Sequence, residues 1–124
     1  MEQGSETALS LRGKTLNAVR YITVHYAEKL SIATLAAECH LCPDVFVRRF
    51  KDEQGMNPCE YIKRYRLDAA KTLLAGSLSN VQEIAYKVGY NDVSQFNRLF
   101  RAQEGKTPLA YRYTTQVRSS LDRK

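Results

Sequence analysis

Two clusters that combine basic side chains with small polar, acidic or apolar ones recur along the chain, about fifty residues apart. The clusters are Asp44, Val47, Arg48 and Lys51 in the first copy, and Val93, Ser94, Asn97, Arg98 and Arg101 in the second. Guanidinium and amide groups can form paired hydrogen bonds with base edges, and Lys or Arg neutralises phosphate. Because residues three and four positions apart share one face of a helix, each cluster could contact a nucleic acid from one helix.

The distribution of charge also favours a polyanionic partner. The 124 residues include 19 Lys+Arg and 13 Asp+Glu, for a formal net charge of +6. Residues up to Val47 carry a net charge of −1, and those from Arg48 onward carry +7. A basic stretch of this kind is typical of nucleic-acid binding, although a solvated basic surface has the same composition.

An internal repeat contains the elements that must position these clusters. All four Phe residues occur in two pairs with a spacing of four, Phe46 with Phe50 and Phe96 with Phe100. The offset of fifty also aligns Gly55 with Gly105, Pro58 with Pro108, and Tyr61 with Tyr111. Upstream the offset is 49, pairing Leu35 with Ile84 and Ala36 with Ala85, so the second turn is one residue longer. On a helical projection each Phe pair points inward and each polar cluster points outward.

Helix start and stop signals predict an all-α chain of about seven helices. The start signals are Ser31, Pro43, Asn57-Pro58, Ser79 or Asn80, Asp92 and Thr107-Pro108, and the stop signals are Gly55, Gly76, Gly89 and Gly105. No segment alternates apolar and polar residues, so no sheet is expected. A short helix, a turn and a longer helix form a helix-turn-helix. A solenoid is disfavoured because it needs three or more repeats.

These signals divide the chain into five parts. We expect a flexible tail over 1–13, a first helix-turn-helix subdomain over 14–56, a linker helix over 57–76, a second subdomain over 77–116, and a C-terminal tail over 117–124.

The chain resembles the DNA-binding domain of the AraC/XylS family of bacterial transcription regulators. The resemblance lies in GYNDVSQFNRLFR (89–101), GKTPLAYR (105–112) and YIKRYRLDAAKTLL (61–74), and it extends over about residues 15–113. It implies a cytoplasmic regulator, in most members an activator, that inserts two recognition helices into successive major grooves of double-stranded promoter DNA and contacts RNA polymerase. Carried over by position, Arg48 and Arg98 would contact bases or backbone, while Asp44, Val47, Ser94 and Asn97 would tune sequence choice.

The first copy departs from the family pattern. It has His40-Leu41-Cys42-Pro43 where the family shows Gly, an aromatic residue, a Ser-type cap and a polar residue. Asp44 is unfavourable near phosphate, although it can accept from a cytosine amino group, so this copy is expected to read DNA weakly or with an unusual preference. The family often carries an effector-binding or dimerisation domain, so the chain is either a compact regulator or a C-terminal piece.

The cysteine and histidine pattern predicts no metal and no cofactor. Cys39-x-x-Cys42 lacks a second ligand pair of zinc-finger spacing, so Cys39 is expected in the core and Cys42 as a substitute cap, with a thiol switch as the alternative. An enzyme is not expected, because the chain lacks a Gly-rich phosphate loop and a nucleophile elbow, and carboxylates such as Glu53 are expected on solvated faces. His25 is expected to be satisfied or partly exposed.

The chain also lacks a run of about 18 apolar residues, so no membrane contact is expected. The alternative function is a basic helical protein-interaction module without specific DNA readout. DNA affinity that falls steeply with salt would distinguish DNA binding from that module.

Overall fold

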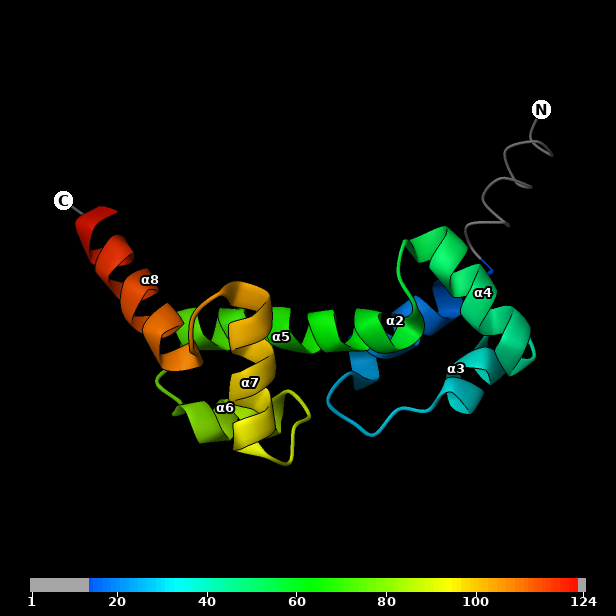
Figure 1. The fold of residues 1–124 in the computed structure, drawn as a ribbon, viewed down its shortest axis with the longest axis horizontal. Coiled ribbons are helices and arrows are strands. Elements are labelled where there is room, and N and C mark those ends of the chain that lie inside the picture. Colours follow the sequence, from blue (N-terminus) through cyan, green and yellow to red (C-terminus); the bar gives the residue numbers. More distant parts are fainter. Residues whose placement is uncertain (1–13, 123–124) are drawn as a thin grey trace. The chain divides into compact units, whose positions relative to one another are not determined.

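The computed structural model describes residues 14–122, which contain seven helices and no strand. The helices are α2 (Leu16–His25), α3 (Ile32–Glu38), α4 (Pro43–Gln54), α5 (Pro58–Gly76), α6 (Val81–Lys87), α7 (Val93–Glu104) and α8 (Pro108–Asp122) (Figure 1). The expected all-α fold with seven helices is confirmed. The expected N-terminal tail, 1–13, lies outside the described residues.

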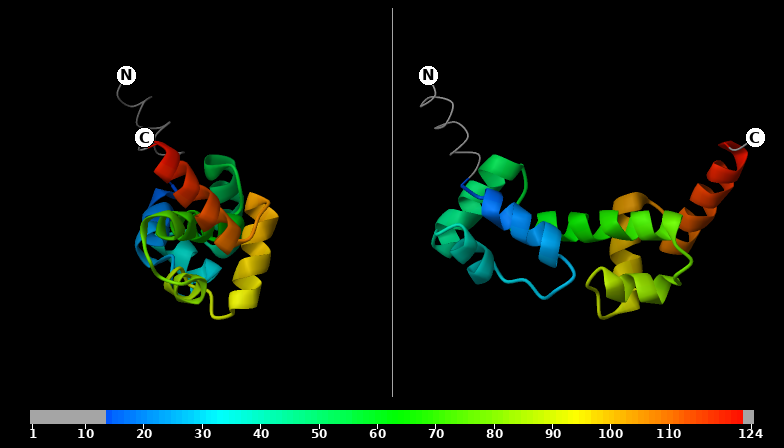
Figure 2. Two further views of the ribbon diagram at one scale, coloured as in Figure 1. Left: turned by 90° about the vertical axis from the view of Figure 1, so that its left-hand side faces the viewer. Right: turned by 180° about the vertical axis from the view of Figure 1, so that it is seen from behind.

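The described residues form two compact units that divide between Tyr65 and Arg66, and α5 runs from one into the other. Helices α2, α3 and α4 belong to the first unit, and α6, α7 and α8 to the second (Figure 2). Helix α8 continues to Asp122, so it includes residues 117–122 of the segment that was expected to be a C-terminal tail. The subdomain limits drawn from the sequence remain a prediction.

Most helices begin at the side chains that the sequence predicted. Ser31 accepts a hydrogen bond from the Thr34 amide at 3.1 Å, and Asp92 accepts one from the Ser94 amide at 2.9 Å. Asn80, rather than Ser79, caps α6 and forms a reciprocal capping box with Glu83. These bonds satisfy amides that the first helical turn leaves without a partner.

The turn between the short and long helices is one residue longer in the second copy, as the change of offset predicted. It spans 39–42 in the first copy and 88–92 in the second. Cys42 does occupy the N-cap position of α4, but its side chain makes no capping hydrogen bond, so the expected substitute cap is wrong in that respect.

Each unit is built around its phenylalanine pair. The ring centroids of Phe46 and Phe50 lie 5.6 Å apart, and those of Phe96 and Phe100 lie 5.8 Å apart. A tyrosine from the next helix meets each pair edge-on, Tyr61 at 5.3 Å from Phe50 and Tyr111 at 5.6 Å from Phe100. The repeat found in the sequence is therefore a repeat in packing.

The other buried apolar side chains come from the helices around each long helix and from the turn that precedes it. In the first unit they are Ala18, Ile22, Leu35, Ala36 and Cys39. In the second unit they are Leu67, Ala70, Leu74, Ile84, Ala85, Val88 and Tyr90. Small residues at Ala36 and Ala85 are 1% exposed or less, which lets the short helix of each copy approach closely.

Replacing Phe96 with Ala should lower the free energy of unfolding of the second unit by about 3–5 kcal/mol, because it leaves a cavity behind α7. Urea denaturation would measure the loss. Phe46→Ala is the matched change in the first unit. An unchanged transition after Phe96→Ala would contradict the buried position of this ring.

His40 adopts the left-handed conformation that a glycine adopts in the other copy. Its φ is +57°, and the aligned Gly89 has a φ of +108°. A residue with a Cβ is disfavoured there by about 1–2 kcal/mol. His40 is exposed, so His40→Gly should remove this strain without leaving a cavity. The free energy of unfolding of the first unit should rise by about 1 kcal/mol or less, and its melting temperature should rise with it. A lower melting temperature would show that the imidazole makes a contribution that outweighs the strain.

Candidate nucleic-acid interface

The outward face of α4 presents one acidic and two basic side chains of the predicted cluster. Asp44, Arg48 and Lys51 are exposed, while Phe46 and Phe50 on the opposite face are fully buried. Val47 is half-buried and packs against the first unit's core, so it lies at the border of this face. Asp44 occupies the first turn, where a negative charge interacts favourably with the helix dipole.

Helix α7 presents the second cluster in the same way. Ser94, Arg98 and Arg101 are exposed, and Val93 and Asn97 are half-buried. The structure therefore brings each predicted cluster onto one helix face, with Val47, Val93 and Asn97 closer to the core than the projection indicated. Whether these residues contact DNA remains a prediction.

The four basic side chains of these faces make no ion pair with any of the described side chains, which are those of residues 14–115. They are Arg48, Lys51, Arg98 and Arg101. Other basic residues are engaged within the protein: Lys71 Nζ lies 3.3 Å from Glu104 Oε1, and Arg112 Nε donates to the Leu74 carbonyl at 2.9 Å. The outward cations therefore have charge available for an external anion.

A shallow, open depression lies on the second unit beside the basic side chains of α7. Asn97, Arg98, Arg101 and Ala102 line it from α7, and Thr107 lines it from the segment before α8. Thr107 also caps α8, since its Oγ1 accepts from the Ala110 amide at 3.2 Å. The depression joins the outward face of α7 to the start of the next helix.

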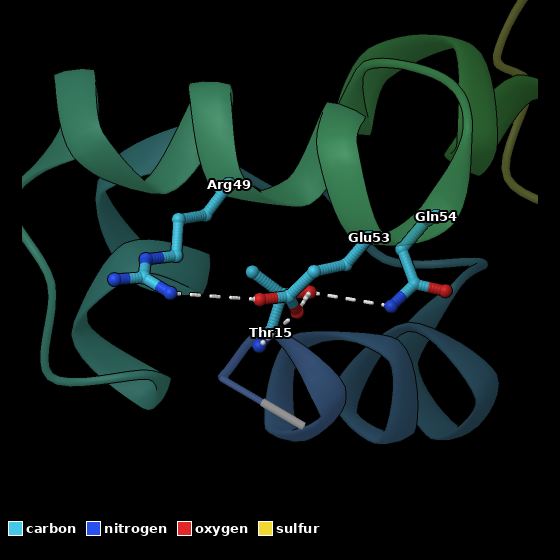
Figure 3. A network of polar contacts seen from close by, with 4 residues as sticks. All are labelled: Thr15, Arg49, Glu53 and Gln54. Atoms are coloured by element: carbon cyan, nitrogen blue, oxygen red, sulfur yellow. Dashed lines mark hydrogen bonds and ion pairs between the residues drawn. The ribbon is translucent and has the colours of Figure 1, made fainter. Parts of the chain in front are cut away.

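A buried carboxylate fixes the end of α4 against the start of α2. Glu53 Oε1 accepts hydrogen bonds from the Thr15 amide at 3.0 Å and from the Thr15 hydroxyl at 2.6 Å (Figure 3). Gln54 Nε2 donates to the same hydroxyl at 3.2 Å, and Arg49 Nη1 lies 4.0 Å from Glu53 Oε2. The Glu53 side chain is 8% exposed, so the expectation that it lies on a solvated face is wrong.

Two basic residues of α5 hold α7 near its two ends. The Arg66 guanidinium lies 5.4 Å from the ring centroid of Tyr90, which precedes α7 and packs against Phe96. Burial raises the pKa of the Tyr90 phenol, and the charge of Arg66 acts in the opposite direction. Lys71 pairs with Glu104, the last residue of α7. These contacts fix the orientation of the outward face of α7.

Sequence reasoning missed the partners of Glu53, Arg66 and Lys71. Each of these contacts, Glu53 with Thr15, Arg66 with Tyr90 and Lys71 with Glu104, joins residues more than 20 positions apart. Helical periodicity gives no information about such pairs. The repeat shows that the residue aligned with Glu53 is the neutral Gln103, which does not identify Thr15 as its partner.

The cysteines and histidines form no metal centre in the described part of the chain, where no group of three potential ligands gathers. Cys39 is in the core, as expected, and burial raises the pKa of its thiol. Cys42 and Cys59 are exposed. His25 is partly exposed, stacks on Tyr21, and lies 2.8 Å from a Glu28 carboxylate oxygen, which agrees with the expected satisfied histidine.

No helix within residues 14–122 is long and apolar enough to cross a membrane.

The fold and the exposed basic faces define a helix-turn-helix protein of the DNA-binding class. A family model described as a helix-turn-helix domain matches residues 35–114. The HTH-type transcriptional regulator YisR of Bacillus subtilis (strain 168) is 36% identical over 95 residues, which are 77% of this chain and 33% of that protein. The chain thus spans about a third of the length of that relative.

Solved structures agree with this family. The DNA-binding domain of AdpA, a global transcriptional factor solved in complex with a target DNA, has a TM-score of 0.80 at 30% identity and is matched over 85% of this chain and 95% of its own. An AraC-type transcriptional regulator from Chromobacterium violaceum has a TM-score of 0.79 at 24% identity, over 84% and 93% of the two chains, which shows a shared fold. The chain belongs to the AraC family of helix-turn-helix transcription regulators.

Replacing Glu53 with Ala should destabilise the first unit by about 2–4 kcal/mol, because the buried Thr15 amide and hydroxyl would lose their acceptor. Glu53→Gln should cost less, since an amide oxygen can still accept from Thr15. Urea denaturation would measure both losses. Gln103→Ala is the matched control, because among the described residues the Gln103 side chain donates to its neighbour Glu104 rather than to another helix. Equal losses for Glu53→Ala and Gln103→Ala would contradict a special role of the carboxylate.

Proposed function

We propose that this chain is the sequence-specific DNA-binding part of a bacterial transcription regulator, and that α4 and α7 enter successive major grooves of double-stranded promoter DNA. The observation that carries the proposal is the pair of exposed helix faces, each of which presents two basic side chains opposite a buried phenylalanine pair. An α-helix fits the width of a major groove, so a helix with this polarity can present side chains to base edges. The AdpA domain, similar in fold, was solved with its target DNA.

Each outward side chain has a role that its chemistry suits. Arg48 and Arg98 can pair with guanine, and Asn97 with adenine. Asp44 can accept from a cytosine amino group, and Ser94 can bond to several bases. Val47 and Val93 can contact a thymine methyl group, while Lys51 and Arg101 neutralise phosphate. In this proposal some site residues contact bases and determine which sequence is bound, while others contact phosphates and position the protein on the duplex.

The proposal extends to the regulator as a whole. It acts in the cytoplasm as an activator that contacts RNA polymerase, and it works together with an effector-binding or dimerisation domain. The described chain has no catalytic role in this proposal.

Arg98→Ala should weaken binding to a preferred duplex by about 1–3 kcal/mol, because it removes a paired contact with guanine. The preferred duplex would come from selection with the 124-residue chain on random DNA, and fluorescence anisotropy would give the affinities. Arg20→Ala, which removes an exposed arginine from α2, is the matched control and should change affinity little.

A scrambled duplex of the same length separates base readout from phosphate contact. Equal losses on both duplexes after Arg98→Ala would show that Arg98 contacts only phosphate. Affinity of the unchanged protein should also fall steeply with added salt. Absence of DNA binding at low salt would contradict the proposed function and favour the protein-interaction module.

A further inference from the structure

The outward faces of the two long helices differ in charge although they are copies of one another. On α4 the exposed charged residues are Asp44, Arg48, Lys51 and Asp52, so two basic and two acidic side chains cancel. On α7 the aligned residues are Ser94, Arg98, Arg101 and Ala102, which carry two basic charges and no acidic charge. The two copies therefore have the same number of basic residues on this face, but only the first copy has acidic residues there.

Asp52 contributes to this difference in charge at a position close to the basic side chains of α4. It is exposed and lies one helical turn after Arg48, on the same side of α4. Its counterpart Ala102 lines the depression of the second unit beside Arg98 and Arg101. Asp52 has no ion pair with the side chains described, those of residues 14–115, so no lysine or arginine among them neutralises its charge.

The neighbouring carboxylate Glu53 does not contribute to this outward charge. Its side chain is 8% exposed and bonds to Thr15 on the core side of α4. Glu104 of α7 is likewise withdrawn by its ion pair with Lys71. The contrast between the two faces therefore comes from Asp44 and Asp52.

An exposed carboxylate next to an arginine has two effects on binding to DNA. It repels phosphate, which weakens the salt-dependent attraction common to all sequences. It also loses hydration when the helix enters the groove, so binding is favourable only where the base contacts repay this desolvation. The first effect acts on every sequence alike, whereas the second acts most strongly against DNA that lacks the correct bases.

We propose that Asp52 is a specificity-determining residue that suppresses binding of α4 to incorrect DNA, while α7 supplies most of the attraction to phosphate. This inference rests on the proposed DNA-binding function. Both helices present side chains that can read bases, but they differ in charge: the cationic face of α7 adds attraction to any DNA, whereas the balanced face of α4 adds little.

A reciprocal exchange of the aligned residues tests the proposal. Asp52→Ala gives α4 the residue of the second copy, and Ala102→Asp gives α7 the residue of the first. Affinities of the 124-residue chain would be measured by fluorescence anisotropy over a range of salt concentrations, on its selected duplex and on a scrambled duplex. Glu38→Ala, which removes an exposed glutamate from α3, is the control for net charge.

Asp52→Ala should raise affinity for the scrambled duplex by about three- to ten-fold at low salt, and should raise affinity for the selected duplex less. Ala102→Asp should lower affinity for both duplexes by a similar factor. An unchanged ratio of the two affinities in Asp52→Ala, or an equal change in Glu38→Ala, would overturn the proposal. The proposed function would still stand after either result if Arg98→Ala weakens binding. Absence of DNA binding by the unchanged protein at low salt would instead contradict the proposed function.

Discussion

Burial of two phenylalanines one helical turn apart is the constraint on which the rest of each unit depends. Residues one turn apart lie on the same face of a helix, so burying Phe46 and Phe50 turns that face of α4 toward the core. The opposite face of α4 is then exposed to solvent. The tyrosine that meets each pair edge-on comes from the following helix, so the same contact sets the direction in which the chain continues. Outward chemistry can then vary without changing the core.

The two copies share this packing but use different polar contacts to hold it. In the first unit a buried carboxylate accepts from the backbone and side chain of Thr15, next to the start of α2. In the second unit the long helix is held by side chains of α5, through Arg66 and Lys71. Apolar packing is therefore the common part of the repeat, and polar contacts adapt each copy to a different neighbouring helix.

Local signals in the sequence predicted the parts of the fold that local physics determines. Ser31, Asn80 and Asp92 cap helices because their side chains reach amides two or three residues away. The projection placed the arginines outward correctly, but Val47 and Asn97 lie nearer the core because packing decides burial at the border of a face. The environment of Glu53 was not predictable, since its partner lies 38 residues away and nothing in its own helix indicates it.

The extra residue in the second turn shows where this architecture accepts insertions and deletions. The segments 39–42 and 88–92 differ in length, yet both connect a short helix to a long helix with its phenylalanine pair buried. An insertion between Phe46 and Phe50 would instead rotate everything after it by about 100° and move the second ring out of the core. Each long helix, from the residue after its turn to its terminal glycine, is therefore a segment whose length is fixed by its buried rings. After a gene duplication, substitutions at the outward positions could change what each helix recognises while the buried packing stays the same.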